Sequence, residues 1–105
     1  MNQVPASGVP DDVYLLDVRE DDEWTAGHAP DAVHIALGQL GDQADQVPKD
    51  RPVYVICRSG ARSGRATQVL GANGWDVTNV SDGMQGWERA GRSMVSESGA
   101  PPFVA

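Results

Sequence analysis

The stretch Val53–Ser63 reads VYVICRSGARS and decides the predicted fold. Its first half is a short apolar run, which is typical of a strand buried on both faces of a parallel sheet. The run delivers Cys57, the only cysteine of the chain, into a loop rich in glycine, serine and arginine. We expect a helix from about Arg62 to Asn73, so the thiol should face the N-terminal end of a helix.

Further apolar runs on both sides of this stretch predict more strands. Val13–Leu16 is apolar and ends at Asp17, and Asp76–Val80 follows the predicted helix. Val33–Ala36 predicts a shorter strand, and a short edge pairing is expected near residues 3–4. The first twelve residues are otherwise expected to be irregular.

Helices are predicted between these strands. Four acids, residues 20–23, favour the positive end of a helix dipole, and Gly27 is predicted to end that helix. Trp24 is expected to face the core. A weaker helical patch is predicted at 37–47 and a short helix at 83–90, carrying Trp87.

The long helix after the loop should have one apolar face. Ala66, Val69, Leu70 and Asn73 recur at i, i+3, i+4 and i+7, so we expect them to line its inner face. Gly74 is predicted to end this helix.

Strands that alternate with helices predict an α/β fold, with a small, mainly parallel sheet flanked by helices on both faces. A length of 105 residues predicts one domain. We expect its core at about 12–92, followed by a C-terminal tail at 93–105. Ligands of such sheets bind at the carboxyl ends of the strands, and Asp17 and Cys57 both fall at such ends.

Composition narrows the functional classes. A net charge of −7 argues against general binding to nucleic acid or anionic lipid. No apolar stretch approaches the ~20 residues that span a membrane. The N-terminus shows no signal peptide, so a cytoplasmic location is predicted. A single cysteine excludes an internal disulfide and a multi-cysteine zinc site, and we expect neither a metal nor another cofactor.

The charge distribution singles out the cysteine loop. Residues 51–75 contain four arginines and no acid, in an otherwise acidic chain. Small residues let the loop backbone turn its N–H groups inward, and such a nest binds anions. With Arg58 and Arg62 nearby, the pKa of Cys57 should fall from about 8.5 into the range of roughly 3.5–7.5 known for activated cysteines. The alternative is an inert, buried core cysteine.

Two other loop chemistries fit the sequence less well. A phosphate-binding P-loop requires a Gly-Lys pair before Ser or Thr, and the loop has no lysine. A cysteine-dependent phosphatase would place five residues between its cysteine and its arginine. Here Arg62 comes one position too early, and the smaller cradle favours a sulfur atom over a phosphate group.

The chain resembles the rhodanese family in its single-domain form, from about Tyr14 to Arg92. The resemblance is carried, in order, by Leu15–Glu20 (LLDVRE), Glu23–Pro30 (EWTAGHAP), Val33–Ile35 (VHI), Cys57–Ser63 (CRSGARS) and Asp82–Trp87 (DGMQGW). It implies an active-site loop at Cys57–Arg62 and a thiosulfate sulfurtransferase. Such an enzyme transfers sulfane sulfur from thiosulfate or a persulfide donor to a thiophilic acceptor, through a persulfide on the cysteine.

The resemblance also implies roles for single residues. Cys57 would be the nucleophile and sulfur carrier, and Arg58 and Arg62 would attract an anionic donor and stabilise the anionic sulfur. The main-chain cradle would come from the residues that follow Arg58, namely Ser59, Gly60, Ala61, Arg62 and Ser63. Asp17 and Arg19 either orient this loop or form a purely structural pair.

Other polar and aromatic residues are given structural roles. His28 is expected in a turn and not in a Cys–His pair. His34 is expected in a strand, and Trp87 in the core or the pocket wall.

The expected partners are small molecules and thiols. The donor would be a small anion, and the acceptor cyanide or an external thiol such as that of a thioredoxin-like protein, because the chain has no second cysteine. The alternative function is a sulfur-carrier or redox-sensing module that serves one dedicated partner with little turnover of free substrate.

Overall fold

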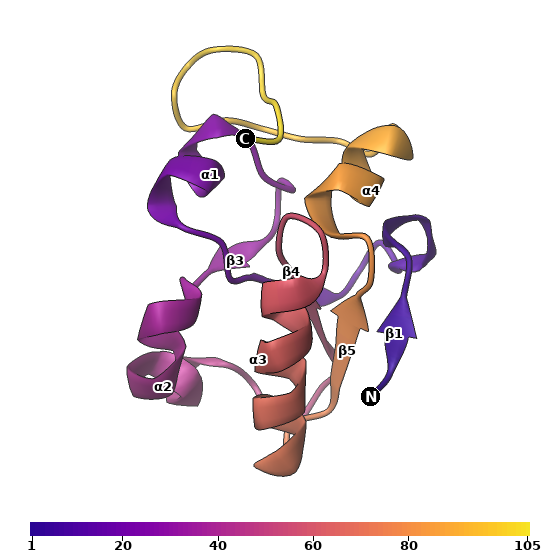
Figure 1. Cartoon of the computed structure of the whole chain (residues 1–105), viewed down its shortest axis with the longest axis vertical. Coiled ribbons are helices and arrows are strands. Elements are labelled where there is room, and N and C mark those ends of the chain that lie inside the picture. The colour runs from indigo at the N-terminus through magenta and orange to yellow at the C-terminus, as the bar shows by residue number, and fades with distance from the viewer.

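A computed structural model describes residues 1–105 as a five-stranded sheet with helices on both faces (Figure 1). The strand order is β1-β5-β4-β2-β3, and all neighbouring strands are parallel. The strands are β1 Gln3–Val4, β2 Tyr14–Asp17, β3 Val33–His34, β4 Val53–Ile56 and β5 Val77–Val80. The α-helices are α1 Asp21–Ala26, α2 Leu40–Gln43, α3 Ala61–Ala72 and α4 Gly83–Arg89. Single 3-10 turns are η1 Ala6–Gly8, η2 Leu37–Gln39 and η3 Ala44–Gln46. The predicted α/β class is therefore confirmed.

The central strand β4 sets the position of the cysteine. It lies between β2 and β5, and Asp17 of β2 is in register with Ile56 of β4. The main-chain N–H of Val18 donates to the carbonyl oxygen of Ile56 at 3.0 Å, so β2 and β4 end side by side. Cys57 thus follows β4 at the edge of the sheet where parallel strands present their carboxyl ends.

The strands are buried on both faces, as continuous apolar runs require. On one face, β2, β4 and β5 pack against α2 and α3, and that cluster includes Leu16, Val53, Val55, Cys57 and Leu70. On the other face they pack against η1 and α4, and that cluster includes Ala6, Leu15, Ile56, Met84 and Trp87. Residues near the N-terminus therefore contribute to the buried interior.

The inner face of α3 differs from the predicted one. Its buried residues are Ser63, Gly64, Ala66, Thr67 and Leu70, whereas Val69 is 61% exposed and Asn73 is exposed. The prediction was wrong for Val69 and Asn73 because Ser63, at the base of the cysteine loop, fixes the rotation of the helix. With 3.6 residues per turn, Ala66, Thr67 and Leu70 follow Ser63 inward. The inner face contains small and polar residues, which apolar periodicity does not reveal.

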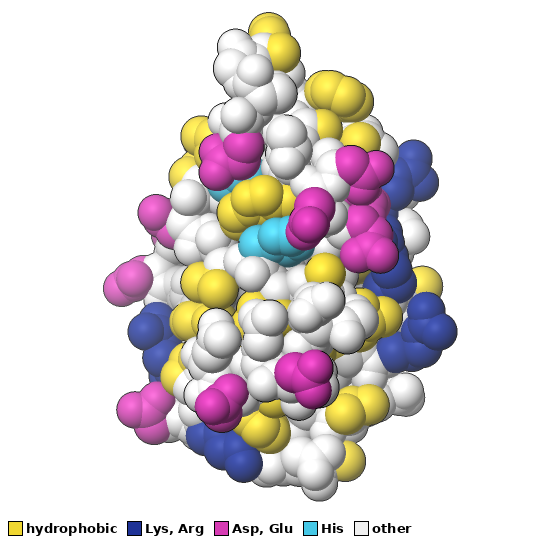
Figure 2. Space-filling view, turned by 90° about the vertical axis from the view of Figure 1, so that its left-hand side faces the viewer, with side chains coloured by type: hydrophobic (Ala, Val, Ile, Leu, Met, Phe, Trp, Pro, Cys, Tyr) yellow, Lys and Arg dark blue, Asp and Glu magenta, His cyan; other side chains and the backbone are white.

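Helix α1 starts as predicted, with a capping box between Glu20 and Glu23 and acids in its first turn. Trp24 is not the core-facing residue that we expected. Its ring is half-buried at the surface, stacked between His28 at 3.5 Å and His34 at 4.8 Å between ring centroids. Figure 2 shows an apolar side chain held between the two histidines, with acidic side chains beside them.

Residues 93–105 contain no helix or strand, but they contact the rest of the fold. Val95 exchanges two main-chain hydrogen bonds of 2.9 Å with His28, and the N–H of Phe103 donates to the carbonyl oxygen of Ala26 at 3.1 Å. In Figure 1 this yellow segment arches beyond α1 and returns towards it. A Cβ atom at Gly27 would lie 2.5 Å from the carbonyl oxygen of Phe103, so this approach requires glycine. None of the helices is long and apolar enough to cross a membrane.

The corrected rotation of α3 can be tested with neighbouring substitutions. Leu70→Ala should lower the free energy of unfolding by about 2–5 kcal/mol, because it opens a cavity in the core. Val69→Ala should change it by no more than about 0.5 kcal/mol, because Val69 is mostly exposed. Urea denaturation of both variants measures the difference. Equal losses at the two positions would contradict the rotation.

Candidate active site

The sulfur of Cys57 lies at the bottom of a short loop between β4 and α3. The residue is only 1% exposed. Its Sγ atom accepts a hydrogen bond from the main-chain N–H of Gly60 at 3.1 Å and lies 3.3 Å from the hydroxyl of Ser63. The predicted concave loop at the start of a helix is thus present, and the sulfur occupies its centre.

Helix α4 fixes the orientation of the first peptide groups of the loop. The N–H of Met84 donates to the carbonyl oxygen of Cys57 at 2.8 Å, and the N–H of Gln85 donates to that of Arg58 at 3.0 Å. Gly83 has φ 59°, and a Cβ atom there would lie 2.5 Å from both carbonyl oxygens. Because these carbonyls point towards α4, the following N–H groups of the loop are free to point inward.

Strand β5 holds the middle of the loop through a residue that the sequence analysis did not identify. The buried side chain of Asn79 donates from Nδ2 to the carbonyl oxygen of Gly60 at 3.2 Å. Its Oδ1 atom accepts from the Ser63 hydroxyl at 2.6 Å. Gly60 itself has φ 102° and packs directly on the carbonyl of Ser81, which leaves no room for a side chain. The amide side chain of Asn79, next to Thr78 and between the two valines of the strand Val77–Val80, was the available signal.

Hydrogen bonds lower the pKa of Cys57. Burial alone would raise it, but hydrogen bonds from the Ser63 hydroxyl and from the N–H groups of Ser63, Gly60 and Ser59 outweigh that effect. The direction agrees with the expectation from the sequence. The lowering comes mainly from the loop donors and not from Arg58 or Arg62, to which we had assigned part of the effect.

The hydroxyl proton of Ser63 has two acceptors, the amide oxygen of Asn79 and the sulfur of Cys57. One proton cannot serve both. Beside a neutral thiol, the shorter contact to Asn79 is favoured. When Cys57 ionises, a hydrogen bond to the anion is about twice as strong as one to a neutral acceptor, so the thiolate competes for the proton. Ser63 can therefore respond to the charge on the sulfur.

Arg62 does not offer the free positive charge that we expected. Its guanidinium forms two hydrogen bonds with the carboxylate of Glu23 in α1, at 2.7 and 2.9 Å. The hydrogen bond from Arg62 holds the pKa of Glu23 at about 2, although burial opposes this effect. The same pairing raises the pKa of Arg62. Glu23 is thus a further residue of the site that was not predicted from the sequence, where it was assigned to the helix start and to a family motif but to no role beside the cysteine.

Arg58, Ser59 and Ala61 form the exposed rim of the loop. The Nε atom of Arg58 donates to the main-chain oxygen of Ala105 at 3.1 Å, which brings residues 93–105 to the edge of the site. Arg58 has no ion pair with the side chain of an Asp or Glu, unlike Arg62.

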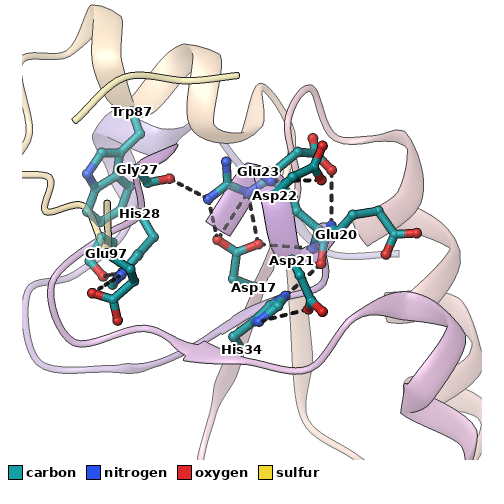
Figure 3. A network of polar contacts seen from close by, with 12 residues as sticks. Asp17, Glu20, Asp21, Asp22, Glu23, Gly27, His28, His34, Trp87 and Glu97 are labelled. Atoms are coloured by element: carbon teal, nitrogen blue, oxygen red, sulfur yellow. Dashed lines mark hydrogen bonds and ion pairs between the residues drawn. The ribbon is translucent and has the colours of Figure 1, made fainter. Parts of the chain in front are cut away.

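Asp17 and Arg19 form a buried pair beside the loop. Both side chains have zero exposure, and Arg19 binds the Asp17 carboxylate through Nε and through Nη2, the latter at 2.8 Å (Figure 3). Nη2 of Arg19 also donates to the carbonyl oxygen of Gly27 at 2.7 Å. Neither residue has a hydrogen bond to the cysteine loop. These contacts support the structural alternative, in which the pair holds the end of β2 against the turn after α1.

The histidines and Trp87 do not line the cysteine loop. Nδ1 of His28 donates to the carbonyl oxygen of Ala29 at 2.8 Å, and Nε2 of His34 donates to that of Arg19 at 2.7 Å. Trp87 is 6% exposed in the core, with its Nε1 on the carbonyl oxygen of Ser93. The expectation that His34 is a strand residue is confirmed, whereas His28 forms an isolated antiparallel bridge with Val95 and not the expected turn.

Fold and site together define an α/β domain that holds a cysteine, activated by hydrogen bonds, at the carboxyl end of its central strand. The profile of the rhodanese-like domain matches residues 6–90, so the chain belongs to the rhodanese-like domain family. It is 41% identical to the putative sulfurtransferase YtwF of Bacillus subtilis over 78 residues, 74% of this chain and 76% of that protein. It is 37% identical to a sulfurtransferase of Allochromatium vinosum over 90 residues, 85% of this chain and 84% of that protein.

Solved structures agree with this assignment. The crystal structure of a rhodanese-related protein from Thermoplasma volcanium superposes with a TM-score of 0.85 at 26% identity. The alignment covers 90% of this chain and 98% of that one. The family and these relatives support a transferase and sulfur transfer as its general chemistry.

The loop donors can be tested by the rate of Cys57 alkylation with iodoacetamide as a function of pH. The wild-type midpoint should lie below the ordinary thiol value of about 8.5. Ser63→Ala should move it upward, because the thiolate loses one donor. Ser59→Ala is the control, since Ser59 acts through its N–H group and its midpoint should not move. A wild-type midpoint at the ordinary value, or equal shifts in both variants, would contradict this role of the loop.

Proposed function

We propose that the protein is a thiosulfate sulfurtransferase of the rhodanese type, which carries sulfane sulfur as a persulfide on Cys57. The donor would be thiosulfate or an organic persulfide, and the acceptor cyanide or a thiol. The observation that carries the proposal is the position of Cys57 Sγ, 3.1 Å from the N–H of Gly60 and inside a loop that lowers its pKa. A sulfur held in this way can be an anion before and after it receives a second sulfur.

The transfer has two balanced steps. In the first, the Cys57 thiolate attacks the outer sulfur of thiosulfate; the new S–S bond forms as the old one breaks, and sulfite leaves with the electron pair. With a persulfide R–S–SH, the same attack gives Cys57–S–SH and the thiolate R–S⁻. In the second step, cyanide or an acceptor thiolate attacks the outer sulfur, which regenerates the Cys57 thiolate. No net oxidation occurs.

The acceptor has to come from outside, because Cys57 is the only cysteine. We propose a small thiol, cyanide or a protein thiol such as that of a thioredoxin-like protein. The roles of Arg58 in attracting an anionic donor, and of Ser59, Gly60, Ala61, Arg62 and Ser63 in providing main-chain donors, belong to the same proposal. A cytoplasmic location stays a prediction from the sequence.

A sulfur-carrier or redox-sensing module that serves one dedicated partner is the second candidate. The lack of a second cysteine fits it, because a persulfide on Cys57 can be passed only to a thiol from outside the chain. Multiple turnover with cyanide distinguishes the candidates: an enzyme releases many equivalents of thiocyanate, whereas a carrier stops after the first.

Mass spectrometry of the intact protein tests the shared chemistry. After incubation with thiosulfate, and separately with cysteine persulfide, the wild-type protein should gain the mass of one sulfur atom. Treatment with cyanide should remove that mass. Cys57→Ser should gain nothing, because its hydroxyl cannot form the persulfide. Absence of the gain with both donors, or an equal gain in Cys57→Ser, would overturn the proposal.

A further inference from the structure

Two arginines near the carboxyl ends of β2 and β4, Arg19 and Arg62, are each neutralised by a carboxylate. Arg19 is paired with Asp17, and Arg62 is paired with Glu23 through both oxygens. The Glu23 side chain is 14% exposed and that of Arg62 is 29% exposed, so the second pair is partly shielded from water. Arg58 is exposed at the rim of the loop, where its Nε atom donates to the main-chain oxygen of Ala105. Salt screens the charge of an exposed arginine.

The cradle is therefore made mainly of dipoles and carries little net positive charge. Main-chain N–H groups and one hydroxyl suit a single negative charge on a sulfur atom. Thiosulfate brings two negative charges towards a thiolate that already carries one. An organic persulfide brings one charge when ionised and none when protonated, so it meets less repulsion.

We infer that Glu23 selects the sulfur donor by charge: by neutralising Arg62, it favours an organic persulfide over a dianion such as thiosulfate. This inference rests on the proposed function and narrows its donor class. Glu23 reaches the site only through Arg62 and is a specificity-determining residue that does not touch the reacting sulfur.

Glu23→Gln is a suitable test because it removes the charge and keeps the shape. The amide oxygen can still accept the N–H of Glu20, which now donates to Glu23 at 3.0 Å, and one hydrogen bond to Arg62 remains possible. Asp22→Asn is the matched control, since it removes one charge from the same helix at an exposed position that makes no contact with Arg62. Circular dichroism and thermal unfolding establish that both variants fold.

The first measurement needs no sulfur chemistry. Iodoacetate and iodoacetamide both alkylate a thiolate with loss of iodide, and they differ by one negative charge. In Glu23→Gln, the ratio of the iodoacetate rate to the iodoacetamide rate should rise about fivefold, because Arg62 then carries an uncompensated charge. Asp22→Asn should leave the ratio within about twofold of wild type, because the charge it removes is exposed and screened. The double variant Glu23→Gln/Arg62→Gln restores the wild-type net charge and should return the ratio towards wild type.

The second measurement uses the donors themselves. The rate of sulfur uptake from thiosulfate should rise about tenfold in Glu23→Gln at low salt, and that from cysteine persulfide by less than about threefold. The difference should shrink at high ionic strength. An unchanged alkylation ratio, or an equal gain with both donors, would overturn the inference. If neither donor loads Cys57 in any variant, the proposed function fails, while the alkylation ratio still decides whether Glu23 controls the charge of the site.

Discussion

The hydrogen bond from the N–H of Gly60 to the sulfur of Cys57 is the contact on which the site depends. A residue that is 1% exposed can ionise only if donors replace the water that it has lost. Gly60 can provide its N–H because its backbone is left-handed and its carbonyl is held by Asn79. Helix α4 turns the carbonyls of Cys57 and Arg58 away from the sulfur. The sheet, α4 and α3 thus act together to keep the N–H of Gly60 directed at the sulfur.

This arrangement gives the arginines a smaller role in binding the anion than the sequence indicates. From the sequence, four arginines without an acid between 51 and 75 indicate a strongly positive site. In the structure, Glu23 arrives from α1, distant in sequence, and cancels the charge of Arg62. The sulfur is held mainly by peptide N–H groups together with the Ser63 hydroxyl, and none of these donors titrates. The ion pair also joins α1 to the first turn of α3. It therefore fixes the position of the Arg62 side chain as well as neutralising its charge.

Features that depend on neighbours along the chain could be predicted from the sequence alone. Apolar runs identified the strands, and a cysteine followed by small residues identified the anion cradle. Features that depend on packing between distant segments were missed. Asn79 appears as one polar residue in a strand, and only the approach of β5 to the loop explains it. Val69 was placed inward because the true inner face of α3 begins with Ser63, a polar residue. Trp24 was assigned to the core, but two histidines cover its faces at the surface.

A crystal structure of the persulfidated protein would test the central claim most directly. We predict that the outer sulfur on Cys57 lies within hydrogen-bond distance of the main-chain N–H groups of residues 59–63. The contacts of Arg62 with Glu23 should remain intact in that state. An outer sulfur bound to the guanidinium of Arg62, with the Glu23 pair broken and the N–H groups turned away, would contradict the claim that peptide dipoles hold the anion.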